Sequence, residues 1–225
     1  MEKNMAAAIG SNLSFWDQVE KTKRLLLIWK SYASEAKEKQ LDLFRRCGAV
    51  DPFVAKLFAN PPMQVLDLGA GRGFNTFPMV RAGSYVTAID LSEELLSAYA
   101  RQSTLAGCSC KNLRLLQRDI TTIKSYEGPF DLVIAVDILS YLLPTTLRST
   151  MEKIYTCLVE RGILIGTLFT AEERHSVRES MEQLGAHFYE NGSEFVSSLL
   201  QNSGFKIFEI ERHDGGVFRF KAQKI

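Results

Sequence analysis

Residues 65–73 read VLDLGAGRG, an apolar strand that runs directly into a glycine-rich turn. A second apolar run, VTAID at residues 86–90, ends in the carboxylate of Asp90. Glycines at a strand-to-helix turn let the backbone bend tightly and let a ligand approach without meeting a Cβ atom. An acid that closes the next strand can accept hydrogen bonds from both hydroxyls of a ribose. The two segments therefore predict a nucleoside-binding site at the carboxyl edge of a parallel sheet.

The spacing of the glycines separates the classes of nucleotide site. The dinucleotide fingerprint needs the pattern G-x-G-x-x-G, but Phe74 occupies the position of its last glycine. The sequence also lacks the Gly-Lys-Ser/Thr tripeptide that a P-loop requires. The pattern DLGAGRG at residues 67–73 instead resembles the first motif of the Rossmann-like (class I) S-adenosylmethionine-dependent methyltransferases. This resemblance implies S-adenosylmethionine as the cofactor, with S-adenosylhomocysteine as its product.

Later segments resemble further motifs of the same family, in the family's order. LLQRDI at residues 115–120 resembles the third motif, in which an acid takes the adenine amino group and the next residue packs on the ring. FDLVIAVD at residues 130–137 resembles the fourth motif, and GILIG at residues 162–166 the fifth strand. Size and motif order place the narrower resemblance with the tellurite-resistance and small-molecule methyltransferases. The resemblance covers about residues 60–225 and implies these cofactor-binding residues: Asp67, Gly69, Ala70, Gly71, Gly73, Asp90, Leu91, Asp119, Ile120 and Val136.

Simpler roles stay open for two of these acids. Arg118 and Asp119 are adjacent and could form only a surface pair, which contributes little to stability. Asp67 lies in an otherwise apolar strand end, where an unpaired carboxylate would be costly. We expect Asp67 to order the glycine loop or to reach the methionine ammonium of the cofactor through water.

From residue 65 onward, strand-like and helical segments alternate. Strands are expected at 64–68, 85–89, 112–116, 131–136 and 161–168, and helices at 74–82, 92–105, 145–158 and 193–202. This alternation predicts an α/β fold with a parallel sheet and helices on both faces. Two further strand-like segments flank Asp214 and Gly215, a strong hairpin signal. We therefore expect a Rossmann-like, seven-stranded, mostly parallel sheet that ends in an antiparallel hairpin, as the methyltransferase resemblance implies.

Residues 1–60 differ from the rest of the chain because they are charged and helical in pattern and precede the first strand. Apolar residues repeat there on one helical face, which must be buried. We expect the segment to be a helical cover on the sheet edge, a lid over cofactor and acceptor with Trp16 or Tyr32 among its contacts, or both at once. Residues 61–225 are expected to form the S-adenosylmethionine-binding methyltransferase domain.

The composition narrows the partners. The chain has 225 residues, enough for one α/β domain with an appendage, and a net charge of +1. This charge provides no strong field to attract nucleic acid. Neither a run of about 20 apolar residues nor a basic-then-apolar leader is visible, so we expect a cytoplasmic protein without a membrane partner. The four cysteines lack zinc-type spacing, and no metal is expected.

Methyl transfer from a sulfonium is an in-line displacement that relies on proximity and orientation. A general base is required only where the acceptor must lose a proton early, so a catalytic constellation need not be visible. The candidates are Asp137 and Tyr141 after the fourth strand, and His187 and Tyr189 between the fifth strand and the next helix. Each of the four could equally be a capping, packing or surface residue.

Some acceptor classes are disfavoured. Residues 136–139 read VDIL where amino-group methyltransferases of adenine or glutamine usually carry Asn/Asp-Pro-Pro-aromatic, and no cysteine follows a proline, as cytosine-C5 methylation needs. A polyamine synthase would carry an acidic pair after the fourth strand, which is absent from the sequence. We expect transfer of a methyl group to an N, O or S atom of a small molecule. The sequence also leaves open whether the protein forms a homodimer. A protein or RNA methyltransferase and a non-catalytic S-adenosylmethionine-binding subunit are the alternatives.

Overall fold

The computed structural model describes residues 51–57, 59–105, 108, 110–169, 193–213 and 217–225. The expected amino-terminal helices, with Trp16 and Tyr32, lie outside these residues, as do His187 and Tyr189. None of the described helices combines the length and apolar character that a membrane crossing needs.

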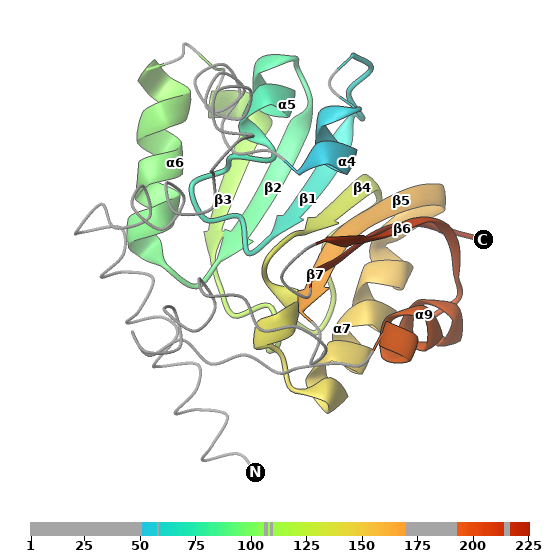
Figure 1. Ribbon diagram of the computed structural model, residues 1–225. Helices are drawn as coiled ribbons and strands as arrows, with labels where there is room; N and C mark the ends of the chain where they lie inside the picture. The colour runs from blue at the N-terminus through green and yellow to red at the C-terminus, as the bar shows by residue number, and fades with distance from the viewer. Residues whose placement is uncertain (1–50, 58, 106–107, 109, 170–192, 214–216) are drawn as a thin grey trace.

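A seven-stranded sheet forms the centre of the molecule (Figure 1). Its strands are β1 (Gln64–Leu68), β2 (Tyr85–Asp90), β3 (Leu113–Gln117), β4 (Phe130–Ala135), β5 (Leu158–Phe169), β6 (Phe205–His213) and β7 (Val217–Lys224). They lie in the order β3-β2-β1-β4-β5-β7-β6. The first five strands run parallel, while β7 pairs antiparallel with both β5 and β6. The expected mostly parallel sheet with a C-terminal antiparallel pair is confirmed.

Helices cover both faces of this sheet (Figure 1). They are α4 (Pro52–Ala55), α5 (Phe77–Arg81), α6 (Glu93–Leu105), α7 (Pro144–Cys157) and α9 (Ser193–Asn202), with short 3-10 turns at Cys110–Asn112 and Leu139–Tyr141. One core cluster joins α7 and α9 to the sheet, for example through Met151 and Leu200. The second cluster, on the other face, joins α4, α5 and α6, for example through Phe53, Val80 and Tyr99. The residues just before β1 are therefore part of the core of the domain.

Local sequence explains where several elements begin and end. Pro144 occupies the first turn of α7, where its missing N–H leaves no intrahelical hydrogen bond unmade. Leu147, Met151 and Ile154 then repeat at helical spacing and are fully buried. Gly204 follows α9 with φ +87°, the left-handed conformation that ends helices.

Two predicted boundaries differ from the structure by three residues, whereas the other differences are of one residue. A helix was expected from residue 74, but α5 begins at Phe77 because the chain is still turning after Gly73. The backbone N–H groups of Thr76 and Phe77 both donate to the carbonyl of Gly73, which closes a turn before the helix. β5 begins at Leu158, earlier than expected, because Leu158 pairs with Phe130 before a register shift restores the regular ladder.

β1 lies between β2 and β4, and all three strands are parallel. The chain continues from β1 to β2 on one side, whereas β4 and β5 extend the sheet on the other side. Ligands of open α/β sheets bind at the carboxyl ends of strands where the strand order reverses in this way. The fold therefore places the glycine turn after β1 at the expected binding edge.

Candidate cofactor and acceptor site

The three glycines after β1 all have positive φ angles, +69° at Gly69, +53° at Gly71 and +74° at Gly73. A Cβ atom on Gly69 would lie 2.7 Å from Ile138, and one on Gly73 would lie 2.3 Å from the ring of Tyr99. A Cβ atom on Gly71 would meet nothing within 4 Å. Gly69 and Gly73 thus allow close packing inside the protein, whereas Gly71 presents backbone to open space.

Asp90, at the end of β2, is joined directly to this open position. The backbone N–H of Gly71 donates to Asp90 Oδ2 over 2.8 Å, and that of Ser92 donates to Oδ1 over 2.9 Å. These bonds fix the plane of the half-buried carboxylate, and each oxygen has two lone-pair directions. Leu91 follows as a half-buried apolar residue. The carboxylate is therefore oriented beside a backbone position that faces open space, as a ribose-binding acid requires.

Asp67 is buried inside the domain, with 3% of its surface exposed. Thr76 Oγ1 donates to Asp67 Oδ2 over 2.6 Å, which leaves the Tyr99 hydroxyl, 2.9 Å away, to donate to Thr76. Burial raises the pKa of Asp67 to about 7; the hydrogen bond from Thr76 opposes this rise and the charge of Asp90 adds to it. The side chain therefore connects the base of the glycine turn to α6 and titrates near neutral pH.

The loop after β3 contains Asp119 and Ile120, the two residues expected to bind the adenine. Asp119 Oδ1 accepts hydrogen bonds from the N–H of Thr121 over 2.8 Å and from its hydroxyl over 2.7 Å. Ile120 is buried, with 4% exposed, and its carbonyl accepts from the hydroxyl of Tyr126 over 3.2 Å. Asp119 is therefore an ordered turn-forming residue.

Asp137 follows β4 and adopts φ +57°, a left-handed conformation that is uncommon for a non-glycine residue. The Asp137 N–H donates to Thr167 Oγ1 over 2.7 Å, and that hydroxyl donates to Asp137 Oδ1 over 3.0 Å. These contacts across β4 and β5 hold an exposed carboxylate at the rim. Val136, directly before Asp137, and Tyr141, in the turn that follows, are half-buried, and Ile138 contacts the glycine turn at the Cα of Gly69. The structure thus brings Asp137 to the edge that carries the glycine turn.

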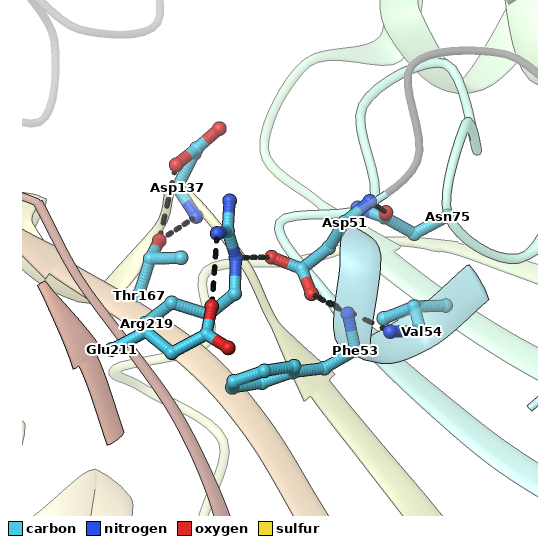
Figure 2. Close-up of polar contacts among 8 residues, drawn as sticks. All are labelled: Asp51, Phe53, Val54, Asn75, Asp137, Thr167, Glu211 and Arg219. Atoms are coloured by element: carbon cyan, nitrogen blue, oxygen red, sulfur yellow. Dashed lines mark hydrogen bonds and ion pairs between the residues drawn. The ribbon is translucent and has the colours of Figure 1, made fainter. Parts of the chain in front are cut away.

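An ion pair that sequence reasoning missed lies beside Asp137 (Figure 2). Asp51 accepts from Arg219 Nε on β7 and from two backbone N–H groups of α4. The Asp51 N–H donates to Asn75 Oδ1 in the glycine turn over 2.8 Å. In Figure 2 the guanidinium of Arg219 lies between Asp51 and Asp137, and its Nη1 is 4.0 Å from Glu211. Asp51 therefore links α4, β7 and the glycine turn.

Four carboxylates come from the ends of four neighbouring strands: Asp67, Asp90, Asp119 and Asp137. Such a set suits a ligand that offers hydroxyl, amino and cationic groups and disfavours a pyrophosphate. The described His, Cys, Asp and Glu side chains form no group of three or more that could hold a metal ion. The chemistry of the edge matches the ribose diol, adenine amine, ammonium and sulfonium of S-adenosylmethionine.

Comparison with known proteins gives the family of this region. Residues 65–162 match the family model described as a methyltransferase domain. This stretch is therefore similar to methyltransferase domains. Over 104 residues the chain is 36% identical to YqeM of Bacillus subtilis, which is provisionally named a methyltransferase. The alignment covers 45% of this chain and 40% of YqeM. The chain spans less than half the length of the curated relatives it matches.

Solved structures show that the chain has the Rossmann-like fold of class I methyltransferases. The magnesium protoporphyrin IX methyltransferase of Synechocystis, crystallised with S-adenosylmethionine, has a TM-score of 0.65 and 17% identity over 96% of this chain and 97% of that one. The 1,6-didemethyltoxoflavin-N1-methyltransferase of Burkholderia thailandensis, crystallised with its substrate and S-adenosylhomocysteine, has a TM-score of 0.62 and 21% identity over 90% and 89%. The narrower resemblance to tellurite-resistance methyltransferases stays a prediction.

Proposed function

We propose that this protein is an S-adenosylmethionine-dependent methyltransferase that methylates an N, O or S atom of a small-molecule acceptor. One observation carries the proposal: the open backbone of Gly71 is hydrogen-bonded to the carboxylate of Asp90 at the carboxyl edge of the sheet. This unit combines the close approach and the paired acceptor oxygens that a nucleoside needs.

The remaining residues fit the other parts of this cofactor. Asp67, buried below the turn, supplies negative charge for the ammonium of the methionine end when its carboxyl is ionised. Asp119 and Ile120 supply an acceptor oxygen and a buried apolar side chain for the adenine. Leu91 and Val136, both half-buried, supply apolar surface on either side of β1. Position 74 holds phenylalanine, where a pyrophosphate site would require the last glycine of its fingerprint at the start of the helix.

When bound, S-adenosylmethionine supplies a methyl group on a sulfonium that a nucleophile can displace in line. The residues of this chain then have to hold the acceptor opposite that methyl group and exclude water. Asp137 is the carboxylate best placed to orient the acceptor and to take its proton, because Thr167 fixes it at the rim of β4. Tyr141, six residues after Ala135 at the end of β4, is the second candidate at this rim.

The choice of a small molecule rests on two supports. The net charge of +1 gives no general attraction to nucleic acid, and two proteins of similar fold are named for small ring-containing substrates. A protein or RNA acceptor would be an outcome of the assay below. An intact Gly71–Asp90 unit argues against a non-catalytic relative, in which the ribose acid or the glycine turn would be degraded.

The proposal is tested by thermal-shift measurements on the full chain with S-adenosylmethionine, S-adenosylhomocysteine and decarboxylated S-adenosylmethionine. We expect stabilisation by the first two and less by the third, because the third lacks the methionine carboxylate. Methyl-labelled cofactor is then incubated with separate pools of small metabolites, peptides and RNA. Label transferred to the metabolite pool supports the proposal. Absence of binding, or label transferred only to peptides or RNA, contradicts it.

A further inference from the structure

Lys153 on α7 makes an unusually complete set of contacts with the loop after β3. Its Nζ donates to the carbonyls of Ile120 over 3.1 Å, Thr121 over 3.2 Å and Ile123 over 2.9 Å. An ammonium has three N–H donors, and all three are directed at the backbone of this one loop. Hydrogen bonds from a charged donor are about twice as strong as neutral ones. Lys153 therefore fixes the path of the chain from Ile120 to Ile123.

A second contact holds Lys153 in this position. Its Nζ lies 5.7 Å from the ring centre of Tyr126, within cation–π range. The hydroxyl of Tyr126 donates to the same Ile120 carbonyl that Lys153 binds. Burial lowers the pKa of Lys153, and the nearby charge of Asp119 opposes this effect. Two side chains from different elements thus converge on the residue that follows Asp119.

The other end of the loop is fixed by Asp119, whose Oδ1 accepts both the N–H and the hydroxyl of Thr121. Asp119 lies on the side of the loop that continues from β3, whereas Lys153 approaches from α7. The two clamps share Thr121, because its N–H faces Asp119 and its carbonyl faces Lys153. A movement of Lys153 would therefore be passed to the carboxylate that is expected to meet the adenine.

We propose that Lys153 is a positioning residue for base recognition. It holds Asp119 and Ile120 where they can contact the adenine of the cofactor, and it does not touch the cofactor itself. This inference rests on the proposed function, because it takes the loop after β3 as the adenine-binding loop. The discrimination between adenine and other purines then depends on a lysine outside the recognition residues.

Lys153 can be replaced without leaving the loop carbonyls dehydrated. A groove of about 740 Å³ lies between this loop and α7, and Lys153, Thr121, Ile123 and Tyr126 are among its lining residues. Water in the groove can bind carbonyls that lose their ammonium partner. We therefore expect Lys153→Met to fold while its loop gains freedom, at a cost in pre-organisation.

The experiment uses calorimetry on the full chain to measure dissociation constants for two compounds, S-adenosylhomocysteine and S-inosylhomocysteine. In S-inosylhomocysteine an oxygen replaces the amino group of the adenine. Wild type should prefer the adenine compound. Lys153→Met should weaken binding of S-adenosylhomocysteine by about tenfold and reduce the preference by a similar factor, as the loss of a pre-organised contact predicts. Lys153→Arg, which keeps charged donors, should retain most of the preference. Lys124→Met is the matched control, because Lys124 lines the same groove but is exposed on the loop.

The outcomes separate the two proposals. Wild-type binding of neither compound would overturn the proposed function and this inference together. Wild-type binding with an unchanged affinity and preference in Lys153→Met would overturn only the role of Lys153. A uniform loss for both compounds would also overturn it, because a merely structural lysine would lower both affinities equally. If Lys153→Met does not fold, Lys153→Leu, which also removes the donors and keeps an aliphatic side chain, is held to the same criteria.

Discussion

Replacing Asp67 by asparagine tests the buried acid below the glycine turn. The change keeps the shape of the side chain, and the hydroxyl of Thr76 can still donate to the amide oxygen as it does to Asp67 Oδ2. It removes a group that is buried and close to Asp90. We therefore expect a more stable protein that binds S-adenosylmethionine more weakly.

The magnitude follows from the pKa of Asp67, which rises from 3.8 to about 7 in the folded protein. Between about pH 4 and pH 7 the folded state keeps a proton on Asp67 that the unfolded state has already released. The contribution of Asp67 to the free energy of unfolding therefore falls as pH rises through that window. Each pKa unit corresponds to about 1.4 kcal/mol, which gives a cost of up to about 4 kcal/mol above pH 7. Asparagine carries no such cost, because its amide does not ionise.

The assay is urea unfolding of both proteins at intervals from pH 4 to pH 8. The variant should gain stability over wild type progressively across this range and reach a plateau near pH 7. Asp131→Asn is a matched control, because Asp131 is half-exposed and its side chain also accepts one hydrogen bond, from the N–H of Gln64. A constant difference between Asp67→Asn and wild type over the whole range would refute the reasoning, and so would unchanged cofactor affinity at pH 8.

Three further predictions concern the glycine turn and the amino-terminal segment. Gly71→Val should abolish cofactor binding, which calorimetry measures, whereas Gly83→Val should leave it intact. Both glycines have positive φ and open space around a Cβ, so both variants carry a similar backbone strain of about 1–3 kcal/mol and differ only in their distance from the proposed cofactor site. Gly73→Ala should lower the free energy of unfolding by about 2–4 kcal/mol in urea titrations, because its Cβ would lie 2.3 Å from the Tyr99 ring; an unchanged midpoint would contradict this packing. Deletion of residues 1–34 should lower turnover far more than the melting temperature if the segment is a lid; a truncated protein with full activity would leave only a structural cover.

Strand positions could be predicted from sequence because each strand is a short apolar run between turn residues. β1 was placed without error, and the helix expected from residue 145 begins one residue earlier, at Pro144. The strand order, with β7 between β5 and β6, could not come from such local signals, because the family resemblance implied only a C-terminal antiparallel hairpin.

The parts of the site that sequence did not reveal depend on long-range contacts. Asp51 and Arg219 are 168 residues apart, and nothing near either residue marks the other as its partner. Lys153 likewise stands in an ordinary helical pattern, and only the packing of α7 brings it to the carbonyls after β3. The left-handed conformation of Asp137 depends on Thr167 across the sheet. Local patterns therefore supplied the proposed cofactor residues, while the supporting residues required the fold.

The most direct test of the central claim is a calorimetric titration of S-adenosylhomocysteine into wild type and Asp90→Ala. The substitution removes both acceptor oxygens and frees the N–H of Gly71. We predict one binding site in wild type and a loss of about 2–4 kcal/mol in the variant, or about 30-fold or more in affinity. Glu152→Gln, an exposed acid on α7, should bind as wild type does. Equal affinity in wild type and Asp90→Ala would contradict the assignment of this edge as the cofactor site.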